Sequence, residues 1–253
     1  QFIDFGGWTL IGKTLDRIKH KTFDYPIIST NLKYLKYVKK ALRLSKIGSY
    51  KIILEPSKKN TAPAILSAAL IDDIPLQQPL MYFTADHLIE NPNKLIKSIV
   101  QNKSNLGEKN IFIFGIKPSI PSSDYGYFLT KKNKSNDKVT RFVEKPNILK
   151  AKNILKLGAH WNSGMFFVMK KSLIFNYKKY QPNMYKNCLI SVNKSIYKNN
   201  VYYLNKKSFE KNNAKSFDYA VLEKSKNLNA IKLNIQWSDL GSWKEICKVY
   251  DKL

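Results

Sequence analysis

The chain has 253 residues, of which 43% are hydrophobic and 13% aromatic, enough for one large α/β domain or two smaller ones. It contains no run of about 18 apolar residues, which excludes a transmembrane helix. The net charge is +26, but only three of the 44 basic residues are arginines, and the lysines occur in ones and twos. Base readout and phosphate clamps favour arginine, so we expect no specific nucleic-acid partner, with loose polyanion binding left open at low salt.

The two cysteines give no sign of a metal or redox centre. Cys188 and Cys247 lie far apart and outside any CxxC pattern, so we interpret them as reduced thiols. The opening segment QFIDFGGWTL is not a basic-then-apolar signal sequence, and it lacks an initiator Met. We therefore expect a cytoplasmic protein with no membrane association, whose natural start need not be Gln1.

Helix and strand patterns alternate over the first half of the chain. Apolar residues at helical spacing predict helices over 9–19, 31–46, 61–73 and 91–101, the second capped by Asn31. Short apolar runs predict strands over 26–30, 50–54, 79–86 and 110–116. This alternation predicts an α/β fold with a mainly parallel mixed sheet flanked by helices.

The pattern is less regular after Tyr125. Strands are predicted over 139–145, 164–170 and 228–234, and helices over 149–157 and 172–180. The lysine-rich stretch 131–138 indicates an exposed hairpin or loop. No internal repeat and no linker rich in Gly, Pro or Ser divides the chain, so we expect one domain over residues 1–253, with its second half covering the site.

The first candidate site combines FVEKP with the WNSG segment that follows it. Glu144 and Lys145 end an apolar strand that Pro146 stops, and residues 161–164 indicate a turn leading into the next strand. In open α/β sheets, ligands bind beyond the carboxyl ends of the strands. Glu and Asn side chains can bind sugar hydroxyls and Lys can hold a phosphate, so Glu144, Lys145 and Asn162 predict a sugar-phosphate site.

A second candidate site lies in LEPSKKNTAPA. Glu55 ends a strand, and a helix begins near Asn60 and Thr61. Free amides at a helix N-terminus favour an anion or a polar ring edge, and the Glu55 carboxylate could accept from guanine N1–H and N2–H₂. Capping by Asn60 and a solvated Glu55 explain the same residues equally well.

Acidic and glycine residues at other strand ends extend the candidate site. Asp86 and Asp239 each follow an apolar strand, and Asp239 lies between Trp237 and Trp243. Two such carboxylates could share one Mg²⁺, although an Asx-turn or a helix cap would also use an aspartate. Gly126, between two tyrosines, would let a ligand approach the backbone, or would form an ordinary turn. The chain has no GxSxG nucleophile elbow and no Walker sequence.

Seven segments occur in an order that resembles one enzyme family: EPSKKNTAPA, TADH, DYGYF, FVEKP, WNSGMF, SFDYAVLEK and WSDLGSW. They are similar to the mannose-1-phosphate guanylyltransferases, or GDP-mannose pyrophosphorylases, of the bacterial type that often carries a fused mannose-6-phosphate isomerase domain. The resemblance runs from about residue 50 to the C-terminus. It implies a Rossmann-like nucleotidyltransferase domain that converts GTP and mannose 1-phosphate to GDP-mannose and pyrophosphate.

The resemblance also implies roles on the nucleotide side of the site. Glu55, Asn60 and Thr61 would contact the guanosine. Asp86 and Asp239 would hold Mg²⁺, which places both among the catalytic residues. Because the attacking sugar phosphate is already ionised at neutral pH, this chemistry depends on in-line positioning and charge neutralisation and needs no general base.

On the sugar side, the resemblance implies that Gly126, Glu144 and Asn162 bind the mannose. Lys145 would pair with the sugar phosphate as a catalytic residue. The pair Glu223-Lys224 matches a family motif, and the resemblance gives it no definite role. Assembly into a homo-oligomer is left open.

The chain departs from the family pattern at both ends. The family's glycine-rich loop, of the form GGxGTRLWPLS, does not occur here, and neither does an isomerase domain. That loop wraps the triphosphate, so we expect this polypeptide to show little or no transferase activity in a pyrophosphate-release assay. The alternatives are an inactive relative that binds a nucleotide or a partner, and a sugar-1-phosphate nucleotidyltransferase of other specificity.

Overall fold

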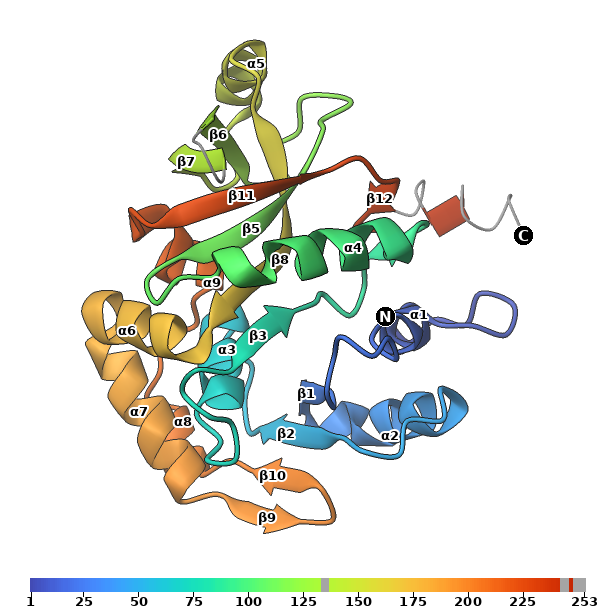
Figure 1. The fold of residues 1–253 in the computed structure, drawn as a ribbon. Coiled ribbons are helices and arrows are strands. Elements are labelled where there is room, and N and C mark those ends of the chain that lie inside the picture. The colour runs from blue at the N-terminus through green and yellow to red at the C-terminus, as the bar shows by residue number, and fades with distance from the viewer. Residues whose placement is uncertain (133–136, 242–245, 248–253) are drawn as a thin grey trace.

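The computed structural model describes residues 1–132, 137–241 and 246–247, and Figure 1 shows its ribbon. These residues form an α/β fold in which helices flank mixed sheets. The predicted α/β class and mixed sheet are confirmed. No helix in the described ranges is long and apolar enough to cross a membrane.

The smaller sheet has four strands in the order β1-β2-β10-β9, two from the first half of the chain and two from the second. Its strands are β1 (Ile27–Asn31), β2 (Lys51–Glu55), β10 (Val201–Tyr203) and β9 (Ile196–Lys198). The first three run parallel, and β9 pairs antiparallel with β10. Around β1 lie the predicted helices, as α1 (Leu10–Arg17), η1 (Leu32–Tyr34) and α2 (Leu35–Leu44), and Asn31 caps η1 as expected.

The larger sheet has six strands in the order β3-β8-β5-β11-β7-β6. They are β3 (Pro79–Tyr82), β8 (His160–Met169), β5 (Ile111–Ile116), β11 (Leu228–Leu233), β7 (Asp137–Val143) and β6 (Tyr127–Lys132). Only β5 and β11 pair in parallel, because β8 runs antiparallel between β3 and β5 and because β6 and β7 form a hairpin. Parallel pairing is therefore less common here than the alternation of helices and strands predicted.

Strand β5 shows how the core is divided between the two faces of this sheet. Ile111 and Ile113 face a cluster built with α3 (Thr61–Ala69), α6 (Lys170–Tyr180) and α7 (Pro182–Asn193). Phe112 and Phe114 face the opposite cluster, built with α4 (Pro92–Asn102) and α5 (Ile148–Lys156). All six residues of β5 are buried, as expected for a central strand covered on both faces.

Short elements complete the fold around the candidate site. Strands β4 (Leu88–Ile89) and β12 (Trp237–Ser238) pair antiparallel. They connect the segment after β3 with the segment after β11. The other short helices are η2 (Lys103–Asn105), α8 (Lys206–Phe209), α9 (Phe217–Ala220) and η3 (Leu222–Lys224).

The WNSG segment is not the turn that the sequence predicted. Residues 161–164 lie inside β8, which begins at His160. The turn-like composition reflects a local irregularity, since Gly164 has φ +74° and the register of β8 against β5 shifts between Ile113 and Gly115. A glycine tolerates this left-handed conformation, so the strand continues through it.

Candidate functional site

Gly126 and Glu144 lie side by side at one end of the β6–β7 hairpin. Tyr127 pairs with Val143, which brings the preceding glycine next to the following glutamate. A Cβ atom at position 126 would collide with Glu144 Oε2, so a larger residue there would force the Glu144 side chain to move. Glu144 Oε2 is itself buried and has no hydrogen-bond partner. It is therefore a buried acceptor that the described part of the protein leaves unsatisfied.

Asn162 joins this pair from β8. Its backbone N–H donates to the Gly126 carbonyl at 2.7 Å, and its side-chain Nδ2 donates to Asp218 Oδ1 at 2.9 Å. The sequence prediction missed Asp218, because this residue follows no strand and lies in the first turn of α9. The structure thus brings Gly126, Glu144 and Asn162 together and adds Asp218 to them.

Negative charge is concentrated around Glu144. Burial, and then the neighbouring Asp218, raise the pKa of Glu144 to about 7. Burial likewise raises the pKa of Asp218. Glu223, from the pair without a definite role, accepts a hydrogen bond from the Glu144 backbone N–H at 3.0 Å. The charged forms of both carboxyl groups are therefore disfavoured in this cluster.

Lys145 provides the nearest positive charge to this cluster. Its charge opposes the raised pKa of both Glu144 and Asp218. Its backbone has φ +43°, a left-handed conformation that costs energy in a residue with a side chain. Lys145 is exposed, so its ammonium can reach a bound anion.

Asp86 and Asp239 meet around His87. The structure places His87 where both carboxylates act on its charge, although burial is the larger effect and lowers the pKa of His87. Trp237 Nε1 donates to His87 Nδ1 at 3.2 Å, which fixes the imidazole ring. The two strand-end aspartates therefore share one neighbourhood.

Tyr125 connects Asp239 with the cluster around Glu144. Its hydroxyl donates to Asp239 Oδ1 at 3.0 Å, and the next residue along the chain is Gly126. Its ring lies 4.6 Å from that of Trp161 and 5.5 Å from that of Trp237, measured between ring centroids. The second tryptophan of the WSDLGSW motif, Trp243, lies outside the described residues.

The aspartates suit a hydrated divalent cation. Asp86 has a side chain that is 54% exposed, and Asp239 Oδ1 also accepts from the Gly241 backbone N–H at 3.2 Å, as in an Asx-turn. Within the described ranges, no group of three or more His, Cys, Asp or Glu side chains is arranged to hold a metal ion. Two carboxylates without a full protein cage match Mg²⁺, which keeps several waters and binds substrate phosphates.

The predicted nucleotide segment adopts the capped helix start that was the alternative explanation. Asn60 has φ +65° and accepts from the Thr61 backbone N–H at 2.8 Å. Thr61 Oγ1 accepts from the Phe217 backbone N–H at 2.8 Å, next to Asp218. The beginning of α3 is thereby tied to the cluster around Glu144 that includes Asp218. Capping does not exclude ligand binding, because both side chains remain exposed.

Glu55 occupies a separate position at the end of β2. Its Oε1 accepts from Ser29 Oγ at 2.8 Å, and burial raises its pKa despite this hydrogen bond. Asn31 Nδ2 donates to the Glu55 carbonyl at 3.0 Å. These hydrogen bonds anchor Glu55 between β1 and β2. Within the described part of the chain, no hydrogen bond joins its side chain to the cluster around Glu144.

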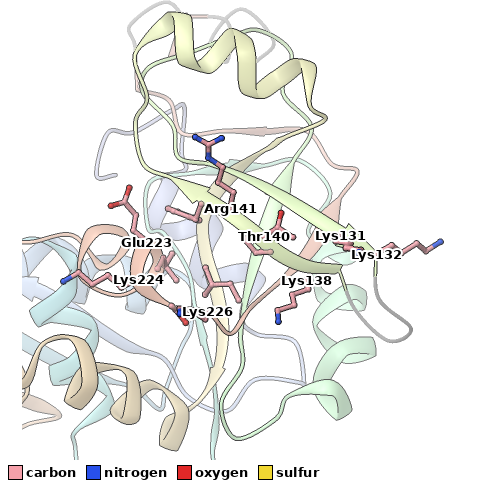
Figure 2. Close-up of a pocket in the computed structure, with 13 residues that line it drawn as sticks. Lys131, Lys132, Lys138, Thr140, Arg141, Glu223, Lys224 and Lys226 are labelled. Carbon is pink, nitrogen blue, oxygen red and sulfur yellow. The ribbon is translucent and has the colours of Figure 1, made fainter.

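A groove of about 790 Å³ lies beside the acidic cluster, between β7 and the segment that contains η3. Its lining includes Arg141, Phe142 and Glu223, together with five lysines: Lys131, Lys132, Lys138, Lys224 and Lys226. Figure 2 shows that these basic side chains point in different directions instead of converging. The groove is therefore not where the candidate residues gather, and we place the site at the Gly126 and Glu144 cluster.

The nucleotidyl transferase family profile matches residues 1–253. The chain is 33% identical to a mannose-1-phosphate guanylyltransferase of Escherichia coli, over 98% of this chain and 54% of that protein. It is 29% identical to the alginate biosynthesis protein AlgA of Pseudomonas fluorescens, over 100% of this chain and 54% of that protein.

One solved structure has a similar fold over nearly its full length. A crystal structure described as mannose-6-phosphate isomerase from Helicobacter pylori matches with a TM-score of 0.84 and 27% identity, covering 94% of this chain and 93% of that one. The chain spans about half the length of the curated relatives it matches. With the family profile matched from end to end and the fold shared, the chain belongs to the nucleotidyl transferase family.

Proposed function

We propose that this chain forms the site of a mannose-1-phosphate guanylyltransferase, which makes GDP-mannose and pyrophosphate from GTP and mannose 1-phosphate. The observation that carries the proposal is the cluster of Gly126, Glu144, Asn162 and Asp218, in which Glu144 Oε2 is buried without a partner. Sugars offer several hydroxyls that both donate and accept, and such a cluster of carboxylates and a carboxamide matches them. The name of the Escherichia coli relative, mannose-1-phosphate guanylyltransferase, supports the same reaction.

The sugar would lie beside Gly126 and the Glu144 carboxyl group that packs against it. Glu144 would accept from one sugar hydroxyl through its free Oε2. Asn162, held by Asp218, would present its side chain to the ring in a fixed orientation. Lys145 would pair with the phosphate and stabilise the charge that develops during transfer.

The nucleotide would bind at the carboxyl end of β2 and the start of α3. Glu55 would accept from the guanine edge through the carboxylate oxygen that Ser29 does not occupy. Thr61 and Asn60 would contact the guanosine at the exposed N-terminus of α3, where the helix dipole favours a negative ligand. The link from Thr61 to Phe217 would keep the nucleotide and sugar positions in register.

Asp86 and Asp239 are the residues that would hold Mg²⁺. When bound, the ion supplies charge neutralisation for the phosphates. Tyr125 would keep Asp239 oriented through its 3.0 Å hydrogen bond. His87, whose pKa is lowered by burial, would remain neutral beside the ion and so would not repel it.

The proposed reaction needs no proton transfer from the protein. The phosphate of the sugar is the nucleophile and is ionised at neutral pH, so the residues act by aligning it and by balancing charge. Glu144, Asn162 and Lys145 would fill such roles, because they can orient the sugar and balance the charge of its phosphate. As part of the same proposal, the enzyme would work in the cytoplasm.

Ligand selectivity tests this proposal directly. The chain is titrated calorimetrically, in MgCl₂, with GDP-mannose, GDP-glucose, UDP-glucose and dTDP-glucose. GDP-mannose should bind at least about tenfold more tightly than the uridine and thymidine compounds, which corresponds to about 1.4 kcal/mol. Preference for UDP-glucose or dTDP-glucose would reassign the base specificity, and no binding of any sugar nucleotide would contradict the proposal.

A further inference from the structure

Helix α1 ends in a buried arginine that has no counter-charge. Arg17 is only 5% exposed, and its Nε and Nη1 atoms are buried without a hydrogen-bond partner. Among the described residues, no carboxylate oxygen lies within ion-pair distance of its guanidinium. A buried, unpaired charge is strongly unfavourable, so this position is incomplete as it stands.

A second unsatisfied polar group lies in the same place. Thr84 Oγ1 is buried without a partner, and the Thr84 carbonyl accepts from Thr14 Oγ1 of α1 at 3.4 Å. The neighbouring Phe83 ring lies 5.9 Å from Arg17 Cζ. Two potential donors, a guanidinium and a hydroxyl, are thus both left without a partner where α1 packs on the segment after β3.

This position adjoins the proposed magnesium site. Thr84 lies two residues before Asp86, and the charges of Arg17, Asp86 and Asp239 all act on His87. A divalent cation held by the two aspartates would bind one side of a polyphosphate, and a guanidinium would bind another. Arginine suits this role because its planar fork binds phosphate oxygens in pairs.

We propose that Arg17, with the Thr84 hydroxyl, binds phosphate oxygens of the nucleoside triphosphate and of the pyrophosphate that leaves. This proposal rests on the proposed function and assigns a new residue to its polyphosphate half. Because Nε and Nη1 are enclosed, binding requires the side chain to turn away from the Phe83 ring toward the cation. Without a bound anion, the buried and unpaired guanidinium would lower the stability of the folded protein. A bound phosphate would remove this unfavourable contribution.

The sign of a stability change separates this role from a structural one. We expect Arg17→Met to be at least as stable as the wild type without anion, because it removes an unpaired buried charge. With MgCl₂ and pyrophosphate, its affinity for pyrophosphate should be at least about tenfold weaker, and its thermal shift correspondingly smaller. Arg43→Met, at an exposed arginine of α2, is the matched control and should keep the wild-type affinity.

Further variants and ligands keep the outcomes distinct. Arg17→Lys keeps the charge but loses the fork, and should bind pyrophosphate with intermediate affinity. Mannose 1-phosphate should bind Arg17→Met as it binds the wild type. A large loss of stability in Arg17→Met without anion, or unchanged pyrophosphate affinity, would overturn the inference. If the wild type binds neither GTP nor GDP-mannose, the proposed function itself fails, whatever the arginine variant does.

Discussion

At the scale of single residues, Glu144 is the group whose titration should be most visible. Its folded-state pKa of about 7 lies above the ordinary value of 4.5, first because of burial and then because of Asp218. Between those two pH values the folded state holds a proton that the unfolded state releases. The contribution of Glu144 to stability therefore falls as pH rises from about 4.5 to about 7 and is level above that range.

Glu144→Gln should remove this pH dependence. The variant should match the wild type near pH 4.5 and become the more stable of the two as the pH approaches 8, in urea unfolding followed at several pH values. Glu108→Gln is the control, because Glu108 is an exposed glutamate that pairs with Lys171 on the surface. A difference between Glu144→Gln and the wild type that does not change with pH would contradict the account of this carboxyl group.

Strand ends and turns made part of the site predictable from the sequence. Glu144 and Asp239 each follow an apolar run. In the structure Glu144 lies beside Gly126, and the charges of Asp239 and Asp86 both act on His87. Asp218 and Arg17 were not predicted as site residues. Their importance comes from burial and from the partners they have or lack, which depend on chain segments far apart in sequence.

At the scale of elements, a buried lysine joins α6 to the segment that follows α3. Lys170 is 6% exposed, and its Nζ donates to the carbonyls of Ile71 and Ile74 at 3.1 and 2.6 Å. Burial lowers the pKa of Lys170. The segment after α3 therefore depends on a side chain about a hundred residues away for its hydrogen bonds.

Lys170→Met should destabilise the protein by about 2 to 4 kcal/mol, because two buried carbonyls would lose their donor. The free energy of unfolding in urea measures the effect. The neighbouring Lys171→Met is the matched control. Lys171 makes only an exposed ion pair with Glu108, so its loss should change stability by less than about 1 kcal/mol. Equal effects at the two positions would show that the buried hydrogen bonds are unimportant.

Most helices and strands followed from local periodicity, and the exceptions have physical reasons. The prediction placed a turn over the WNSG segment and began the strand at Gly164. In the structure β8 runs through both, because Gly164 adopts a left-handed conformation within the strand. Helix α7 and the β9–β10 hairpin were not predicted. The face of α7 is mixed, with buried Met184, Cys188 and Val192 among polar residues, so its pattern becomes clear only against α3 and α6.

At the scale of the whole molecule, the two sheets and their helices bring distant segments to one site. One group of candidate residues lies at the ends of β6 and β7, in β8 and in α9, and the two aspartates follow β3 and β12. Figure 1 shows that the β9–β10 hairpin lies at the end of the molecule opposite the β6–β7 hairpin. The lysines, by contrast, are spread over all parts of the chain, which agrees with a general compositional bias.

The central claim is that the cluster around Glu144 binds the sugar phosphate. Calorimetric titration of mannose 1-phosphate into the wild type and Asn162→Ala tests it, with Asn93→Ala, at an exposed position of α4, as the matched control. The account predicts saturable binding that is at least about tenfold weaker in Asn162→Ala and unchanged in Asn93→Ala. Equal affinity in all three proteins would contradict it.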